Sequence, residues 1–174
     1  MNRFFSLFEP AFLCRKPRVI LALTWVLGLL FGILISICAG EPVAALMRDL
    51  VYTDMSIVGL LSVAILPFLI SAFAVLLSNL PLLLTVVFVN AFLCAHVSAG
   101  VLLTFETAGW LLCALCLFRD FFRLPILWLC WMKAADGERE AFMRCCIPGG
   151  VATGLICVFE YCIVSPFLAE LISF

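Results

Sequence analysis

Three charged residues lie inside an apolar stretch of this chain, where charge can carry chemistry or hold structure. Arg119, Asp120 and Arg123 occur between Trp110 and Met132, among leucine, cysteine and phenylalanine residues that lipid accepts. An ionisable group in lipid costs at least about 2.5 kcal/mol, so such groups normally pair with one another or mark a solute or proton path. The sequence therefore predicts partners for these charges on neighbouring helices.

Glu160 is the predicted partner of this cluster. On one helix Arg119 and Arg123 share a face because they are four residues apart, and Asp120 neighbours Arg123 three residues away. Two arginines and one aspartate leave one positive charge over, and Glu160 lies at a similar depth in the last apolar stretch. We therefore expect Glu160 to pack against the arginine face and to complete an intramembrane charge network.

Three roles are open for this network. It can be a buried ion network that sets helix register and pairing without any chemistry. It can line a solute or proton path together with Asn90 and His96 of the third apolar stretch. It can also be a docking site for the transmembrane helix of a partner. For His96 the favoured interpretation is a neutral, hydrogen-bonded residue between helices or one near the water boundary, and Asn90 fits a hydrogen bond to a neighbouring helix.

Composition argues against several classes of function. The chain has 174 residues, of which 67% are hydrophobic and 12% are charged, whereas soluble domains have about 25% charged residues. A formal net charge of −1 gives no basic patch for nucleic acid. No phosphate-binding loop, zinc-protease motif or serine nucleophile motif occurs. We therefore expect no enzyme activity, catalytic residue, metal or cofactor.

The ten cysteines are interpreted mainly as small hydrophobic residues, because seven of them lie inside apolar stretches. Cys113 and Cys116 form one Cys-x-x-Cys pair without a second pair or a nearby histidine, which makes a metal site the less favoured interpretation. Cys14, Cys145 and Cys146 lie beside predicted membrane entries. Acylated and unmodified thiols are both open for these three.

The apolar stretches predict an all-α, polytopic transmembrane bundle that forms a single integral membrane domain over residues 1–174. A helix needs about 20 mostly apolar residues to cross the hydrocarbon core. The predicted spans are about 19–38, 55–78, 82–103, 107–132 and 147–166. Mixed charged and apolar residues at 1–18 and 41–54 predict short interfacial amphipathic helices.

The charge distribution predicts the orientation of these five spans. If residues 107–132 cross once, the amino terminus and the loop 133–146 share one side, with seven Lys and Arg against Arg48 opposite. If 107–132 is a re-entrant pair of half-helices hinged at 119–125, the spans become six and the count becomes four against four. The positive-inside rule favours the single crossing and places the amino terminus in the cytoplasm.

Small residues predict where helices approach closely. Gly28 with Gly32, and Gly150 with Gly154, form small-x-x-x-small pairs that fit helix packing within one chain or between copies, so the oligomeric state stays open. Pro67 lies inside the second span, where a missing backbone donor predicts a kink.

The order of motifs along the chain resembles a known family. Gly109-Trp110 opens the charged stretch, Arg119-Asp120-Phe121-Phe122-Arg123-Leu124-Pro125 interrupts it, and Phe159-Glu160 precedes Ser165-Pro166. With these features the chain resembles the stage II sporulation protein M family of small bacterial polytopic membrane proteins. Many members have His-Gly-x-x-Glu-Leu-Pro at the interruption, where this chain has arginine, aspartate and arginine. A role of that His and Glu therefore cannot be assigned to this chain. The glutamate of the last span does match, at Glu160.

The resemblance implies a bacterial cell membrane protein that localises partners, such as septal cell-wall hydrolases, without hydrolysing anything itself. We therefore expect a non-enzymatic scaffold or assembly protein whose partners are the lipid bilayer and other membrane proteins. The surface helix expected at 41–54 would be available to such partners. The alternative is a small permease-like transporter component with an intramembrane charged path.

Overall fold

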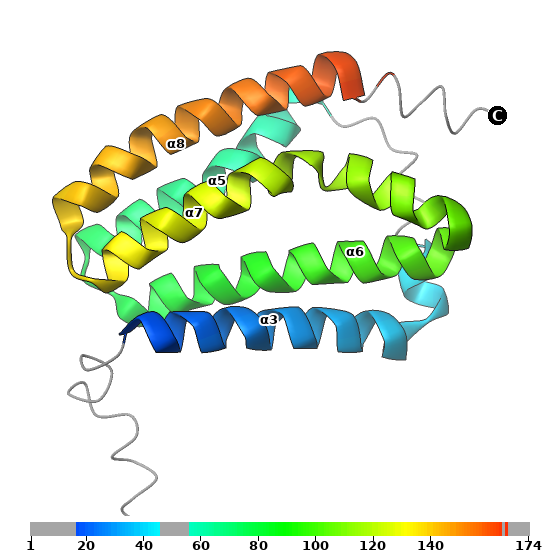
Figure 1. Cartoon of the computed structure of the whole chain (residues 1–174), viewed down its shortest axis with the longest axis horizontal. Coiled ribbons are helices and arrows are strands. Elements are labelled where there is room, and N and C mark those ends of the chain that lie inside the picture. The colour runs from blue at the N-terminus through cyan, green and yellow to red at the C-terminus, as the bar shows by residue number, and fades with distance from the viewer. Residues whose placement is uncertain (1–16, 46–55, 165, 167–174) are drawn as a thin grey trace, which may run out of the picture.

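The computed structural model describes residues 17–45, 56–164 and 166, without the side chains at 106–108, 116 and 164, and these residues contain helices and no strand (Figure 1). The elements are α3 (Pro17–Ala39), α5 (Ile57–Leu76), α6 (Leu80–Cys116), α7 (Phe118–Ala135), α8 (Arg139–Phe159) and the π-helix η2 (Glu160–Val164). Residues 41–45 are also helical. The predicted all-α bundle is confirmed.

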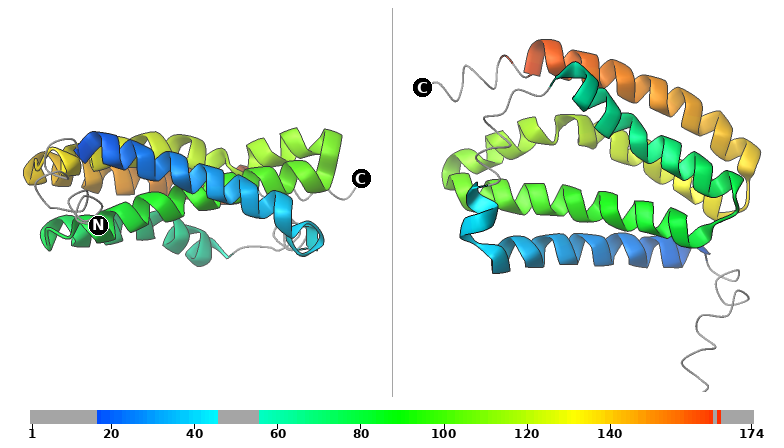
Figure 2. Two further views of the ribbon diagram at one scale, coloured as in Figure 1. Left: turned by 90° about the horizontal axis from the view of Figure 1, so that it is seen from below. Right: turned by 180° about the vertical axis from the view of Figure 1, so that it is seen from behind.

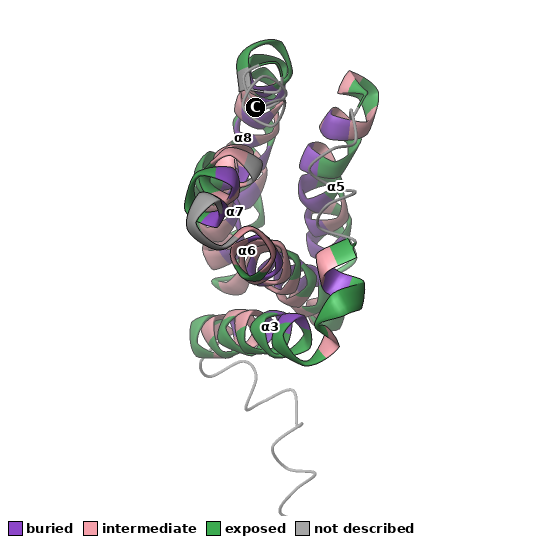
Figure 3. Ribbon diagram, turned by 90° about the vertical axis from the view of Figure 1, so that its right-hand side faces the viewer, coloured by how far each residue is buried: buried purple, intermediate pink, exposed green. Residues whose placement is uncertain are grey.

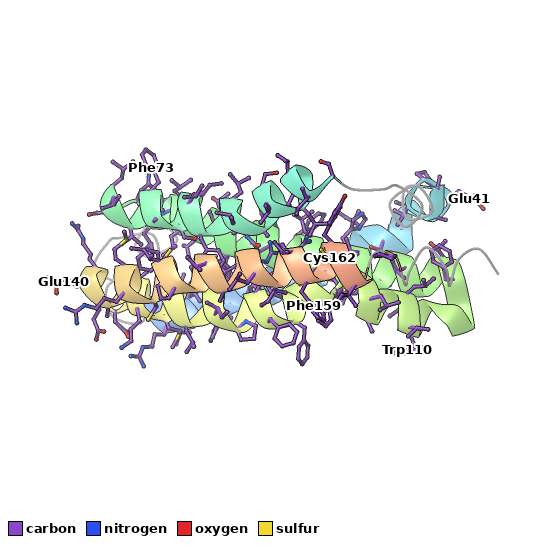
Figure 4. All side chains as sticks on the ribbon, turned by 90° about the horizontal axis from the view of Figure 1, so that it is seen from above. Glu41, Phe73, Trp110, Glu140, Phe159 and Cys162 are labelled. Atoms are coloured by element: carbon purple, nitrogen blue, oxygen red, sulfur yellow. The ribbon has the colours of Figure 1, made fainter. Side chains whose placement is uncertain are left out.

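The helices lie side by side along one long axis, and their ends gather at two ends of the bundle (Figures 1 and 2). The near end, as we call it, holds the start of α3, the α5–α6 turn and the α7–α8 turn. The far end holds Ala39 and the reversal of α6 at residues 106–108. Figure 4 places Glu140 at the near end and Glu41 and Trp110 at the far end. Charged side chains at both ends and a tryptophan at the far end fit a bundle whose long axis crosses a membrane.

Four helical segments are long and apolar enough to cross a membrane, which indicates a membrane protein. They are Pro17–Ala39, Ile57–Leu76, Leu80–Phe105 and Arg139–Ile163. The first three agree within a few residues with the predicted spans. Of the amphipathic helices expected at 1–18 and 41–54, only residues 17–18 and 41–45 lie within the described residues, and residues 17–18 begin α3 itself.

Helix α6 folds back on itself after Phe105. A Cβ atom on Gly109 would lie 3.0 Å from the Cα atom of Leu102, and Leu112 shares a buried cluster with Val101. In a straight helix, residues 101 and 112 would be about 16 Å apart along the axis. The chain therefore reverses at the far end and returns through 109–116 and α7 towards the near end (Figure 1).

The fourth predicted span, 107–132, differs from the structure in two ways. Its helix is broken at Leu117, and its longer part, α7, carries four charged residues and is not among the four apolar spans. The re-entrant alternative is also wrong, because Pro125 lies inside a continuous α7 that runs on to the near end. The charges account for the break, because Arg119, Asp120 and Arg123 then lie at the start of the new helix α7.

The predicted loop at 133–146 is wrong, because most of it is helical. α7 continues to Ala135 and α8 begins at Arg139, eight residues before the predicted start of the last span. The remaining turn is short because Gly137 adopts a left-handed backbone, with a φ of +76°, which glycine takes without steric cost. Glu140 and Arg144 form an i,i+4 pair that supports the added helical turns.

The main core fills the near half of the bundle, and Figure 3 shows buried residues on the facing sides of the helices. Its largest member, Trp131 of α7, is fully buried and donates its indole N–H to Ser71 Oγ of α5 at 2.9 Å. The cluster joins α3, α5, α6, α7 and α8. Its buried members are Leu21, Phe68, Ala74, Val75, Leu83, Val86, Val87, Leu127, Cys130, Trp131, Phe142 and Cys146. In the far half a smaller cluster contains Val43, Val101 and Leu112.

A seam of small residues joins α3 to α6, and this is the most extensive contact between two helices. A Cβ atom on Gly28 would lie 2.6 Å from the Phe88 carbonyl oxygen, and one on Gly32 would lie 2.5 Å from that of Phe92. Ser36 continues the seam one turn later and is buried. The predicted packing role of Gly28 and Gly32 is therefore confirmed, and it operates within one chain.

The second glycine pair does not pack as predicted. A Cβ atom on Gly150 would meet nothing within 4 Å, and one on Gly154 would only touch Leu61 at 3.9 Å. Gly149 is the packed glycine, because a Cβ atom there would lie 2.5 Å from Ile126 Cγ2. The reason is helical phase: the buried face of α8 carries Cys146, Gly149, Thr153 and Cys157.

Ionic contacts tie the helices together at the near end. Arg18 at the start of α3 binds Asp136 of the α7–α8 turn through two hydrogen bonds of 2.6 Å. Arg139 donates a hydrogen bond to Ser78 Oγ in the α5–α6 turn. The guanidinium of Arg18 lowers the pKa of the Asp136 carboxyl below its ordinary value.

Substituting Gly32 by alanine is expected to destabilise the protein, because the added methyl group meets the backbone of α6. Overpacking of this kind costs about 1–3 kcal/mol. The matched control is Gly150→Ala, where open space and better helix propensity predict no loss. The melting temperatures of both variants are measured in detergent from the loss of monodisperse protein on heating. Equal melting temperatures for the two variants would contradict the seam.

Substituting Asp136 by asparagine is expected to lower the melting temperature at neutral pH and to have no effect in acid. A carboxyl with a lowered folded pKa adds stability above its unfolded pKa, and this contribution is lost as pH falls through the folded value. The difference between wild type and Asp136→Asn should therefore close as pH falls below 3.8, the ordinary value. A difference that persists in strong acid would argue against the Arg18 pair.

Candidate functional site

The four predicted charges form one network between the start of α7 and the end of α8. Arg123 Nη2 lies 2.7 Å from Asp120 Oδ1, and Arg119 Nε lies 3.7 Å from the same oxygen. Arg119 Nη1 lies 3.9 Å from Glu160 Oε2. Asp120, Arg123 and Glu160 are 8%, 6% and 8% exposed. The structure thus brings Glu160 to the arginine face, as the charge count predicts.

The new start of α7 positions three of these charges. Leu117, between α6 and α7, has a φ of −97° and a ψ of 5°, and the next helix begins at Phe118. The first turn of a helix carries unpaired N–H groups and a partial positive charge that a carboxylate stabilises. Asp120 supplies that carboxylate in the first turn of α7. Arg123 follows one turn later and pairs with it.

Arg123 also joins α7 to α5 through a carbonyl that a proline leaves open. Pro67 has no backbone N–H, so it cannot donate to the carbonyl of Val63 four residues earlier in α5. Arg123 Nη1 donates to this Val63 oxygen at 3.2 Å. An unsatisfied carbonyl in lipid costs several kcal/mol. One guanidinium therefore pairs with the Asp120 carboxylate and also donates to the carbonyl of Val63.

Val63 is a position that sequence reasoning missed. The sequence predicts a kink at Pro67, and the same residue also signals a free acceptor four positions earlier. What the sequence does not contain is the identity of the donor. Arg123 reaches Val63 because α5 and α7 pack against each other, although they are 60 residues apart.

The network is neutral as a whole, with two guanidinium groups and two carboxylates. Arg119 lies 14 residues from Lys133 on the same helix, which is about 21 Å along the axis and well inside a hydrocarbon core of about 30 Å. Each buried ion costs several kcal/mol of desolvation, and only close pairing offsets this. Arginine does not release its proton in proteins, so any proton movement here would depend on the carboxylates.

Asn90 and His96, the predicted polar lining, are not brought together at the network. The Asn90 side-chain amide donates to the Val86 carbonyl of its own helix at 2.8 Å. His96 Nδ1 lies 2.7 Å from Ser36 Oγ, on the side of α6 that faces α3, and its ring stacks on Phe92. His96 is therefore a hydrogen-bonded residue between two helices, which is one of the two roles that fit it.

Ser36 is a second residue that sequence reasoning missed. It is 1% exposed and lies within hydrogen-bond distance of the Gly32 and His96 carbonyl oxygens as well as of His96 Nδ1. Its spacing of four residues from Gly32 is the signal that extends the small-residue pattern to a polar contact. The hydroxyl places one hydrogen bond in the closest part of the α3–α6 seam.

The cysteines show no arrangement of metal ligands within the described residues, where no group of three His, Cys, Asp or Glu side chains could share an ion. Cys113 packs against the small far cluster, and the Cys116 side chain lies outside the description. Cys146 is buried and its thiol approaches the Phe68 carbonyl at 3.7 Å, so an acyl chain does not fit there. Cys145 is half-buried and Cys14 lies outside the described residues.

Substituting Arg123 by glutamine is expected to lower the free energy of unfolding strongly, because Asp120 then keeps only the more distant Arg119 of these two arginines. Removing one partner of a buried pair costs about 3–5 kcal/mol. The double variant Asp120→Asn/Arg123→Gln should lose less than the sum of the single variants. Denaturant titration measures this coupling.

The control for this cycle is the pair of Glu140 and Arg144, whose side chains are 91% and 82% exposed. Neutralising them is expected to change little, because exposed pairs contribute weakly. Strictly additive losses for Asp120 and Arg123 would show that they do not depend on each other.

No family model, curated protein or solved structure matches this chain. The site must therefore be interpreted from its own residues, and the likeness to the stage II sporulation protein M family stays a prediction from motifs.

Proposed function

We propose that this protein is a non-enzymatic scaffold or assembly protein of a bacterial cell membrane. The observation that carries the proposal is how the buried charges are used. Arg123 binds a carboxylate and a backbone carbonyl, and thereby connects α7 to α5, while Arg119 approaches Glu160 of α8. Groups that are engaged in holding three helices together support a structural use of the network.

The polar residues that a transport path would need support the same choice. His96 bonds to Ser36 towards α3, and Asn90 bonds within α6. These two side chains are therefore not aligned with Asp120 and Glu160 into one line of exchangeable groups. A shape held by buried pairs, with short connections at the near end, suits a protein that presents its membrane surface to partners.

The orientation that we propose places the near end in the cytoplasm. Arg18, Lys133, Arg139 and Arg144 lie at that end among the described residues. Positively charged residues beside membrane helices favour the cytoplasmic side. By its motifs the chain resembles a family that positions septal cell-wall hydrolases, and we propose membrane-associated partners of that kind.

The alternative function is a small permease-like transporter component. One observation favours it: the helix break at Leu117 lies directly beside the buried charges. Discontinuous helices with polar groups at mid-membrane form the binding sites of many transporters. In that case the carboxylates of Asp120 and Glu160 would carry a coupling ion.

The two functions make opposite predictions for Glu160→Gln, which removes charge and keeps size. A scaffold is expected to recover the same membrane partners with and without this substitution. The measurement is quantitative mass spectrometry of proteins co-purified with the tagged chain at native expression, compared with another tagged multi-pass protein of equal abundance. A partner enriched equally by wild type and variant supports the scaffold.

The same two proteins are then reconstituted into vesicles that contain a pH-sensitive dye. The scaffold proposal predicts proton leakage equal to that of protein-free vesicles for both proteins. A proton flux that the wild type carries and Glu160→Gln abolishes would instead establish transport.

A further inference from the structure

The far part of α8 is more exposed than the rest of that helix. The buried face of α8 runs from Phe142 through Gly149 and Thr153 to Cys157, and Glu160 continues it. From residue 157 on, Cys157 and Glu160 are the buried side chains among those described, and the exposed ones are Val158, Phe159, Tyr161, Cys162 and Ile163. We call residues 157–164 the far segment of α8.

The described contacts of the far segment are with α5 and α7. Cys157 packs with Leu60 and Ala64 of α5 in a small buried cluster. Glu160 Oε2 lies 3.9 Å from Arg119 Nη1, whereas charge-assisted hydrogen bonds are about 2.7–2.9 Å long. This ion pair is therefore longer than the 2.7 Å pair between Arg123 and Asp120.

Helix geometry changes at the same level on both sides of this contact. Regular α8 ends at Phe159, and the π-helix η2 begins at Glu160. On the facing side α7 begins at Phe118 after the break at Leu117, and the rings of Phe118 and Phe159 stack with centroids 5.8 Å apart. Single π-turns and helix breaks are common places for bending and are frequent at functional sites.

Packing is also uneven along the bundle. The near half contains the large cluster around Trp131, whereas the two clusters described in the far half have three buried members each. Segments with few buried apolar contacts open locally at a lower free energy than the core. Opening of the far segment would therefore leave the near half of α7 and α8 in place.

We propose that residues 157–164 form a hinged flap, which the Arg119–Glu160 ion pair latches shut, and that its release uncovers the Asp120–Arg123 pair towards the far side of the membrane. The hinge is the transition from α8 to η2 and the turn before it. This inference does not depend on whether the protein is a scaffold or a transporter component.

Two native cysteines report on this movement. Cys157 lies in the flap and Cys130 lies in the near core, and both are fully buried. The experiment treats the purified full-length protein in lipid nanodiscs with N-ethylmaleimide and follows each site by mass spectrometry. Glu160→Gln is expected to speed labelling of Cys157 at least about threefold, because local opening becomes more frequent. Labelling of Cys130 should not change.

The matched control is Glu140→Gln, which removes an exposed carboxylate from the near end of the same helix and should leave both rates unchanged. Unchanged labelling of Cys157 in Glu160→Gln would overturn the latch. Equal acceleration at Cys157 and Cys130 would also overturn it, because Glu160 would then stabilise the whole bundle. If Glu160→Gln does not accumulate, Arg119→Lys weakens the same contact with charge retained and is judged by the same two rates.

Discussion

The structure depends on one constraint: a charge or an open carbonyl within lipid must find its partner inside the protein. Arg123 meets this constraint for two groups at once, the Asp120 carboxylate of its own helix and the Val63 carbonyl of α5. Pro67 creates the second need by removing a backbone donor. The guanidinium is thus a cross-link between two helices, and its charge is compensated where the link is made.

The position of the charges also explains why the fourth apolar stretch is not one straight helix. A charged residue in the middle of a regular helix would have to find all its partners sideways. Breaking the helix at Leu117 places Asp120 in a first turn, where free N–H groups favour a carboxylate. The break therefore lowers the cost of burying Asp120, and it aligns Arg119 with Glu160 on α8.

Helices α3 and α6 are joined to each other by contacts that need no charge. Gly28 and Gly32 let the backbone of α3 approach α6, and Ser36 adds a hydrogen bond to His96 in the same seam. In lipid, close packing of this kind replaces the hydrophobic effect as the force between helices. The bundle thus has a tightly packed pair, α3 with α6, and a group of α5, α7 and α8 whose connection includes buried ions.

The sequence alone determined the helical class, the approximate apolar spans and the charges that must meet, because these follow from local composition and charge balance. Gly28 and Gly32 were also readable, since their spacing fixes one helix face. Tertiary structure decided which glycine of α8 packs, because the phase of a helix against its neighbour selects Gly149 over Gly150. It also decided that Arg123 donates to Val63 and that His96 turns to Ser36. These pairings join residues 60 positions apart, and only the packing of whole helices brings such partners into contact.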